Sequence, residues 1–300
     1  MATIVTLIAA PAGGKLDEAL VACATARLPD AREIWLHPDY VTEVVCDADI
    51  DVADMARLRA ELEQVAKGSP VDMAVHTAQP DARRKKILIA DMDSTMIQQE
   101  CIDELAAEAG IGEHIASVTA RAMRGEIGFE ESLRDRVACL KGLPLTVIDT
   151  VIAERIALMP GGPDLVRTMR ANGAWCALIS GGFIDFTSRI AARIGFQEHR
   201  ANRLLYEDGV LTGKVAEPIL GRQAKADALR EIAAKLGLDP VDALAVGDGA
   251  NDLAMLSLAG MGVALHAKPK VAEQADIRID HNDLTALLYL QGYRRDEFAR

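Results

Sequence analysis

The first 80 residues change repeatedly between a strand-like and a helix-like spacing of apolar positions. The elements that this spacing predicts are, in order, a strand at 2–9, a helix at 14–28, strands at 32–36 and 41–47, a helix at 52–68 and a strand at 71–77. The order βαββαβ is that of the split, ferredoxin-like motif. We therefore expect an N-terminal α+β domain of this type.

A stretch rich in proline and charge then interrupts the pattern. It runs from 79 to 86 and combines Pro80 with four consecutive basic residues, Arg83–Lys86. This composition is typical of an exposed linker between domains. The sequence thus predicts two domains, at 1–80 and 81–300, and its 300 residues are enough for two cores.

Beyond the linker, four short apolar runs are each followed by turn-forming or acidic residues. They lie at 87–90, 175–179, 244–246 and 262–265. Such short and uniformly apolar runs suit strands that are covered on both faces. With helical stretches between them, they predict an α/β fold with a parallel, Rossmann-like sheet whose ligands collect at the carboxyl ends of the strands.

The interval at about 99–158 has helical periodicity and no clear strand pattern. It follows the first strand of the predicted sheet. We expect it to form a small helical cap over the active edge of that sheet.

Composition excludes several classes of function. A formal net charge of −12 argues against a nucleic-acid partner, which needs clustered basic residues. No apolar run approaches the roughly 20 residues that cross a bilayer, and no basic residue precedes the apolar start as in a signal peptide. The five cysteines are odd in number and never spaced as CxxC, so we expect free thiols in a cytoplasmic protein.

Acidic side chains follow two of the predicted strands. Asp91 and Asp93 follow the first, and the segment Gly247–Asp252 follows the third. Two like charges about 4 Å apart repel by roughly 4 kcal/mol at an effective dielectric constant of about 20, so converging carboxylates need a cation. Oxygen ligands with room for water and substrate favour Mg²⁺ over zinc or calcium.

A different kind of strand end follows the second apolar run. Ser180 supplies a hydroxyl, and Gly181 and Gly182 lack the Cβ that would keep an anion from the backbone N–H groups. This pattern is suited to binding a phosphate. An acidic or glycine-rich turn alone would be weak support for a metal and phosphate site. The prediction rests on the occurrence of both at the ends of predicted strands.

Together these motifs resemble the haloacid dehalogenase (HAD) superfamily of phosphotransferases. Within it, residues 87–295 are most similar to the phosphoserine phosphatases. The matching segments are Asp91–Glu100, Ser180–Phe183, Ala201–Arg203 and Gly247–Asp252. The resemblance implies a Mg²⁺-dependent hydrolase that converts O-phospho-L-serine to L-serine and phosphate, the last step of serine biosynthesis.

The resemblance also implies roles for the acidic residues. Asp91 would be the nucleophile that forms a phosphoaspartyl intermediate, and Asp93 the general acid and base. The metal ligands would be Asp91, the backbone carbonyl of Asp93, and Asp248. Asp252 would lie behind them and orient a bound water or Lys225.

The same resemblance assigns the groups that would hold the phosphate. Lys225 matches a lysine that neutralises phosphate charge, although a lysine on a polar helix face is usually solvated. Ser180, Gly181 and Asn251 would complete the phosphate site.

Substrate choice is expected to depend on the helical cap. Arg136 and Glu100 match residues that bind the carboxylate and the ammonium of phosphoserine. Met123 and Phe129 match apolar positions that would exclude water when the cap closes. The alternative is that Arg136 is an exposed helix charge and that Met123 and Phe129 are ordinary core residues.

The N-terminal unit is similar in layout to ACT-type regulatory domains, which bind amino acids at paired interfaces. This layout raises the hypotheses of serine feedback and of a homodimer, with a purely structural role as the alternative. No ligand-binding loop is identifiable in residues 1–80.

Two other functions fit part of the pattern. One is a HAD phosphatase or phosphotransferase acting on another small metabolite, such as phosphothreonine or phosphoglycolate, or transferring phosphate to homoserine. The other is a non-enzymatic phospho-switch of the receiver type. The switch is disfavoured by the order of the acidic residues, by the acid at Asp93 and by the large cap.

Overall fold

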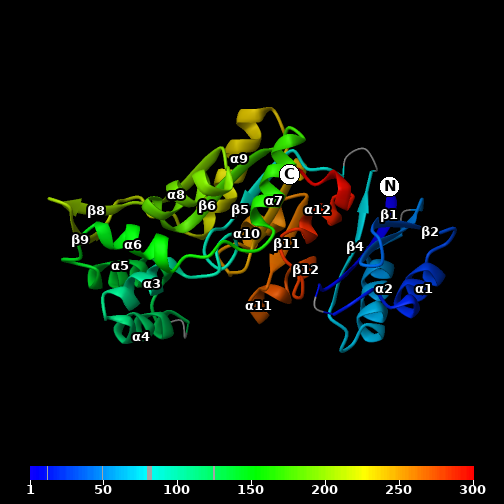
Figure 1. Cartoon of the computed structure of the whole chain (residues 1–300), viewed down its shortest axis with the longest axis horizontal. Coiled ribbons are helices and arrows are strands. Elements are labelled where there is room, and N and C mark those ends of the chain that lie inside the picture. The colour runs from blue at the N-terminus through cyan, green and yellow to red at the C-terminus, as the bar shows by residue number, and fades with distance from the viewer. Residues whose placement is uncertain (12, 49, 80–82, 124–125) are drawn as a thin grey trace.

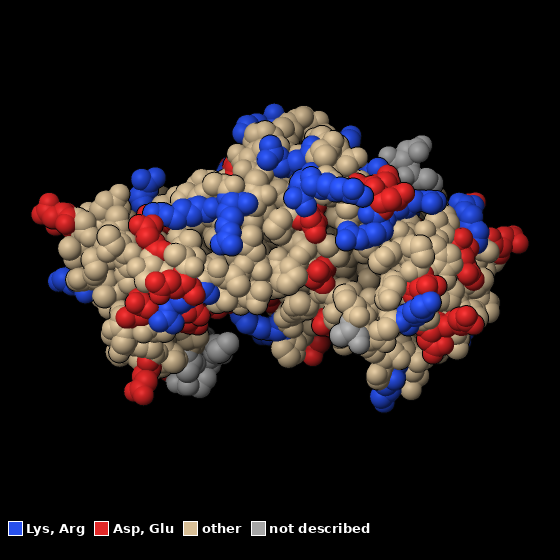
Figure 2. All heavy atoms as spheres, viewed as in Figure 1, with Lys and Arg blue, Asp and Glu red and all other residues tan. Residues whose placement is uncertain are grey.

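The computed structural model describes residues 1–300 apart from 12, 49, 80–82 and 124–125. The N-terminal domain lies at one end of an elongated molecule, the helical insertion lies at the other, and a six-stranded sheet lies between them (Figure 1). Figure 2 shows the same elongated outline with all heavy atoms. The predicted domain boundary at 80–81 falls outside the described residues. Among the residues that are described, no helix is long and apolar enough to cross a membrane.

The N-terminal domain has the predicted βαββαβ order. Its elements are β1 (Ala2–Ala9), α1 (Glu18–Arg27), β2 (Arg32–His37), β3 (Val41–Cys46), α2 (Val52–Val65) and β4 (Val71–Ala78). The strands form one antiparallel sheet in the order β2-β3-β1-β4. Helix α1 begins four residues later than predicted, because the Asp17 side chain accepts a hydrogen bond from the Ala19 N–H and caps the helix there.

All eight residues of β1 are buried. One face of the strand packs under the two helices through Val5 and Leu7. The other face includes Ile8, which belongs to the same apolar cluster as the core of the second domain. The two domains are therefore packed against each other across the sheet.

The second domain contains the predicted parallel sheet. Its strands are β5 (Ile87–Ala90), β6 (Trp175–Phe183), β7 (Glu198–Asn202), β10 (Ala243–Gly247), β11 (Met261–Leu265) and β12 (Ile277–Ile279). Their spatial order is β12-β11-β10-β5-β6-β7, and every pairing is parallel. The four predicted apolar runs form the four central strands.

Helices cover both faces of this sheet. Along β5, Leu88 and Ala90 face one apolar cluster, and Ile87 and Ile89 face the other. The first cluster includes α7 (Gly162–Ala171), α8 (Ile184–Ile194) and α12 (Ala286–Leu290). The second cluster includes α9 (Arg222–Leu236), α10 (Leu253–Leu258) and the single turn α11 (Pro269–Ala272).

The insertion after β5 is helical, as the periodicity predicts. It consists of α3 (Cys101–Glu108), α4 (Gly112–Met123), α5 (Phe129–Cys139) and α6 (Thr146–Glu154). A hairpin that the sequence analysis missed, β8 (Leu204–Glu207) and β9 (Val210–Val215), packs against α5 (Figure 1). Its turn is Asp208-Gly209, both with positive φ, a dipeptide that is a strong hairpin signal.

Candidate active site

The three functional segments lie at neighbouring strand ends. Strands β10, β5 and β6 are adjacent in the sheet, and they end at Asp248, Asp91 and the Ser180 segment. A cavity of about 470 Å³ opens between these ends and the helical cap. Of the residues expected at the site, its lining includes Asp91, Asp93, Glu100, Phe129, Arg136, Ser180, Gly181, Asp248 and Asn251.

Lys225 and Asp252 lie behind this lining. The Lys225 ammonium is 2.7 Å from Oδ1 of Asp91 and 2.6 Å from Oδ1 of Asp252. Lys225 is only 3% exposed and Asp252 is fully buried, so the ammonium is a fixed internal counter-ion rather than a solvated surface charge.

Asp91, Asp248 and Asp252 form one buried carboxylate cluster. One oxygen from each lies within 4.8 Å of the others. The Lys225 ammonium pairs with two of these three acids. Burial and the Asp252 charge raise the pKa of Asp91 well above its ordinary value, and burial raises the pKa of Asp248 to about 6 although Lys268 opposes the shift. The donor set therefore fits a divalent cation with oxygen ligands.

The surroundings of the Lys225 side chain favour its charged form. Burial alone would lower its pKa, but the charges of Asp91 and Asp252 outweigh this effect and raise it. Lys225 is therefore positively charged throughout the neutral pH range.

The two oxygens of Asp91 have different surroundings. Oδ1 accepts a hydrogen bond from the Met92 N–H at 2.8 Å and pairs with Lys225. None of the described residues donates a hydrogen bond to Oδ2. The carboxylate is thus held by one oxygen, and the other is available for chemistry.

The carboxyl group of Asp93 is largely shielded from solvent. Its Oδ1 is buried and has no hydrogen-bond partner among the described residues. Burial, with the negative charge of Glu100, raises the pKa of Asp93 to about 7, and hydrogen bonds from Cys101 limit the shift. A carboxyl group of this pKa can both release and accept a proton near neutral pH.

The end of β6 is shaped by small residues. The Gly182 N–H donates to Oγ of Ser180 at 2.8 Å, and a Cβ on Gly182 would lie 3.0 Å from Oδ2 of Asp93. Asn202, quoted in the sequence analysis without a role, donates from Nδ2 to the Gly181 carbonyl at 2.8 Å and accepts from the Leu220 N–H at 2.7 Å. Asn202 thereby ties the segment before α9 to the glycine turn.

The cap contributes one cation and one anion to the cavity. Glu100 accepts a hydrogen bond from Oγ of Ser94 at 2.9 Å. Arg136 donates from Nε to the Ser132 carbonyl at 3.3 Å, and no described carboxylate lies within ion-pairing distance of its guanidinium. Burial lowers the pKa of Arg136 from its very high ordinary value.

Phe129 joins the cap to the sheet, because its ring would lie 3.5 Å from a Cβ on Gly181. The side chain of Met123 lies outside the described residues, so its expected role is not addressed by the structure.

Several cavity residues were missed by the sequence reasoning. They include Thr119, Arg222 and Lys268 in the lining, and Cys101 beside Asp93. Oγ1 of Thr119 is buried without a hydrogen-bond partner among the described residues. No short motif identifies these residues, because each reaches the site through the packing of a separate element.

The chain is similar in sequence to several known proteins. A profile of the haloacid dehalogenase-like hydrolase family matches residues 88–257. A relative from Mycobacterium tuberculosis, named a phosphoserine phosphatase, is 44% identical over 260 residues, which are 86% of this chain and 63% of the relative. The chain thus spans less than two thirds of the length of that relative.

Two solved structures extend the comparison. A HAD-family hydrolase from Salmonella enterica serovar Typhi is 31% identical, with a TM-score of 0.83 over 99% of both chains. A phosphoserine phosphatase described as a phospho-aspartyl intermediate analogue is 40% identical, with a TM-score of 0.64 over 69% of this chain and 98% of the other.

Proposed function

The chain belongs to the haloacid dehalogenase-like hydrolases, and we propose that it is a phosphoserine phosphatase, which converts O-phospho-L-serine and water to L-serine and phosphate. The observation that carries this proposal is one cavity in which Asp91 and Asp93 face Arg136 and Glu100. The first pair suits phosphoryl transfer, and the second pair suits the two charges of an amino acid.

In the first half of the reaction, Oδ2 of Asp91 attacks phosphorus in line with the bond to the serine oxygen. The phosphorus–oxygen bond to serine breaks as the bond to Asp91 forms, and Asp93 gives its proton to the departing oxygen. The pKa of about 7 makes the protonated form of Asp93 available at neutral pH.

In the second half, a water molecule attacks the aspartyl phosphate. Asp93, now ionised, takes a proton from this water, so that its initial state is restored. The phosphorus–oxygen bond to Asp91 breaks, and phosphate leaves.

We propose Asp91, Asp248 and the backbone carbonyl of Asp93 as the ligands of Mg²⁺. The buried and incompletely balanced carboxylate cluster supports this assignment. The bound ion would neutralise negative charge on the phosphoryl group. Asp252 holds Lys225 in place through its ion pair, and Lys225 would neutralise a further phosphate oxygen.

The remaining phosphate contacts would come from Ser180, Gly181 and Asn251, which line the cavity beside the carboxylates. Arg136 would bind the substrate carboxylate, because it lines the cavity and no described carboxylate lies within ion-pairing distance of its guanidinium. Glu100 would bind the substrate ammonium, and Phe129 would exclude water from the reacting groups.

The test is phosphate release from a panel of phosphorylated amino and hydroxy acids, with Mg²⁺ and with a chelator. Phosphoserine should be the best substrate, and the chelator should abolish turnover. Phosphothreonine or phosphoglycolate as the best substrate would contradict the assignment.

Arg136→Ala tests the substrate contact directly. Phosphoserine kcat/KM should fall at least a hundredfold, equivalent to about 2.7 kcal/mol, while an aryl phosphate without a carboxylate loses much less. Arg134→Ala is the matched control, since Arg134 is on the same helix and pairs with Glu130 and Glu217 at the surface. An equal loss of kcat/KM on both substrates would show that Arg136 does not bind the substrate carboxylate.

A further inference from the structure

A buried carboxylate of the N-terminal domain holds a loop of the catalytic domain. Asp72, on β4, is 4% exposed. It accepts hydrogen bonds from the backbone N–H groups of Asp280, His281 and Asn282 at 2.8, 3.1 and 2.9 Å, and from Nδ2 of Asn282 at 2.9 Å. Hydrogen bonds to a carboxylate are stronger than those between neutral groups. The loop after β12 is thus fixed from the other domain.

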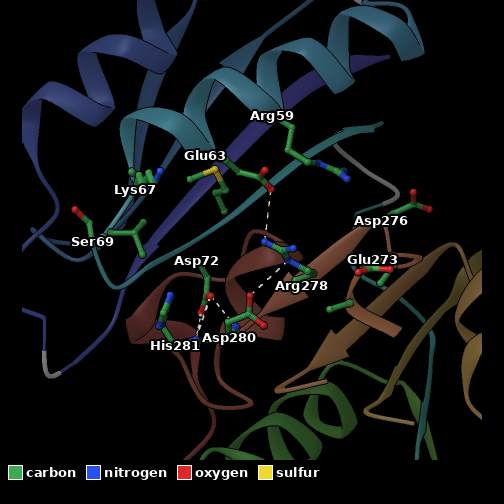
Figure 3. Close-up of a pocket in the computed structure, with 16 residues that line it drawn as sticks. Arg59, Glu63, Lys67, Ser69, Asp72, Glu273, Asp276, Arg278, Asp280 and His281 are labelled. Carbon is green, nitrogen blue, oxygen red and sulfur yellow. Dashed lines mark hydrogen bonds and ion pairs between the residues drawn. The ribbon is translucent and has the colours of Figure 1, made fainter. Parts of the chain in front are cut away.

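This contact lies beside a cleft of about 410 Å³ between the domains (Figure 3). Glu63 comes from α2 and Arg278 from β12, and their charged groups are 3.6 Å apart across the cleft. Arg278 also approaches Asp280 at 3.5 Å. Charged pairs at the surface are weak, so the buried Asp72 is the stronger tie.

The loop that Asp72 holds also contacts the segment after β11. The carbonyl of Asn282 accepts a hydrogen bond from Nε2 of His266 at 2.9 Å, which places the proton of that imidazole on Nε2. The His266 N–H donates to the Ile279 carbonyl at 2.8 Å. His266 has a φ of +44°, a conformation that a β-branched or bulky side chain disfavours and that these contacts stabilise.

Two residues further on, the same segment reaches the active site. The Lys268 N–H donates to the Asp248 carbonyl at 3.3 Å, and its ammonium is 3.6 Å from Oδ2 of Asp248. Lys268 also lines the catalytic cavity. Polar contacts therefore link Asp72 to Asn282 and Asn282 to His266, the backbone leads from His266 to Lys268, and polar contacts link Lys268 to Asp248.

We propose that Asp72 is a positioning residue for the active site, acting through Asn282 and His266 to hold Lys268 against Asp248. The N-terminal domain then contributes to the geometry of the metal-binding edge without touching substrate.

Asp72→Asn tests the proposal because it keeps the size of the side chain but directs an amide N–H toward N–H donors. Glu43→Gln is the matched control. Glu43 is 1% exposed on the neighbouring β3 and pairs with Arg83, but its contacts do not lead to the 266–268 segment. Both variants should lower the melting temperature, since each disturbs a buried charge at the domain interface.

The first readout is amide hydrogen exchange of peptides that contain 266–268. Asp72→Asn should speed exchange there at least fivefold, and Glu43→Gln should leave it unchanged. The second readout is the Kd for Mg²⁺ from calorimetric titration of the full chain. It should fall at least threefold in Asp72→Asn, because the Lys268 ammonium held beside Asp248 competes with Mg²⁺ for this carboxylate. In a Lys268→Met background the same substitution should change the Kd by less than 1.5-fold.

Three outcomes would overturn the proposal: unchanged exchange and Kd in Asp72→Asn, equal changes in Glu43→Gln, or a full effect that persists in Lys268→Met. The inference rests on the proposed function only for the role of Asp248 as a metal ligand. Neither readout uses phosphoserine. If the wild-type chain failed to hydrolyse phosphoserine, the proposed function would be refuted, and hydrogen exchange would still test whether Asp72 is a positioning residue.

Discussion

At the scale of single residues, the central feature is that one ammonium is shared by converging acids. Lys225 pairs with Asp91 and Asp252. Among the described residues, the cation that pairs with Asp248 is Lys268, which lies 3.6 Å away and is 56% exposed. The negative charge at Asp248 therefore destabilises the folded protein unless a cation is bound beside it. This has a measurable consequence for stability.

Asp248→Asn should stabilise the protein in the presence of chelator and remove its stabilisation by Mg²⁺. The pKa of Asp248 is raised to about 6, so its ionised form is less favourable in the folded than in the unfolded state at neutral pH. Removing the charge should add about 1–3 kcal/mol to the free energy of unfolding. Thermal melting with and without Mg²⁺ measures both effects, and a destabilised variant in chelator would contradict the charge argument.

Residue chemistry was only partly predictable from the sequence. Asp91, Asp93 and Asp248 stand directly after apolar runs, so their convergence follows from strand geometry. Lys225 stands on a helix face like any solvated lysine, and only the family resemblance singled it out. Cys101 and Thr119 reach the cavity through cap packing, for which a linear pattern has no signal.

At the scale of elements, the turn after β10 shows how tightly the backbone approaches the site. A Cβ on Gly247 would lie 2.3 Å from Cγ of Asp252. The Asp252 side chain is held in this position, because it pairs with Lys225 and accepts a hydrogen bond from the Gly249 N–H at 3.0 Å. The glycine therefore permits the carboxylate to fill this space.

Gly247→Ala should reduce kcat at least a hundredfold, because displacement of Asp252 releases Lys225 from its place between the two carboxylates. Gly128→Ala is the control, since a Cβ at the start of α5 meets nothing within 4 Å. Steady-state kinetics and melting temperature should be measured together. A fall in stability without a fall in kcat would show that the turn tolerates the displacement.

Elements with a clear apolar period were predicted well, and the remainder were not. The four central strands and the helical cap follow the spacing of apolar residues. Strand β7, with the sequence Glu-His-Arg-Ala-Asn, has no such spacing and is a strand because it extends the sheet beside β6. The hairpin β8–β9 was missed although Asp208-Gly209 marks its turn, because the strands around the turn are short.

At the scale of the whole molecule, the N-terminal sheet buries polar groups against the catalytic domain. Besides Asp72 and Glu43, it includes His76 on β4, whose Nε2 is buried without a partner among the described residues. Burial, with the nearby Arg83 and Lys85 charges, lowers the pKa of His76 to about 3. His76 is therefore neutral in the folded protein across a wide acidic range.

His76→Leu should make the protein less sensitive to acid. Between pH 6.5 and 3 the unfolded chain binds a proton at this histidine and the folded chain does not, so stability falls as the pH falls, by up to about 1.4 kcal/mol per pH unit. Urea unfolding at pH 7 and pH 5 measures this slope. His114→Leu, an exposed position, should keep the wild-type slope, and an unchanged slope in His76→Leu would refute the assignment.

The arrangement of the two domains could not be predicted. The sequence indicated both domains and a charged linker. The apolar pattern of a strand that is buried on both faces does not reveal whether a helix of its own domain or the other domain covers each face. Arg83, taken as part of an exposed linker, instead forms an ion pair with Glu43 and is 13% exposed. Regulation by serine and homodimer formation remain predictions.

The way in which β1 is covered restricts how two copies of this chain can associate. One face of the sheet is occupied by its own helices and the other by the catalytic domain, so neither is free to stack on a second sheet. Of the two outer strands, β4 runs beside β12, whereas β2 has Trp35 40% exposed. A continuous sheet that spans two subunits would therefore have to pair β2 of one copy with β2 of the other.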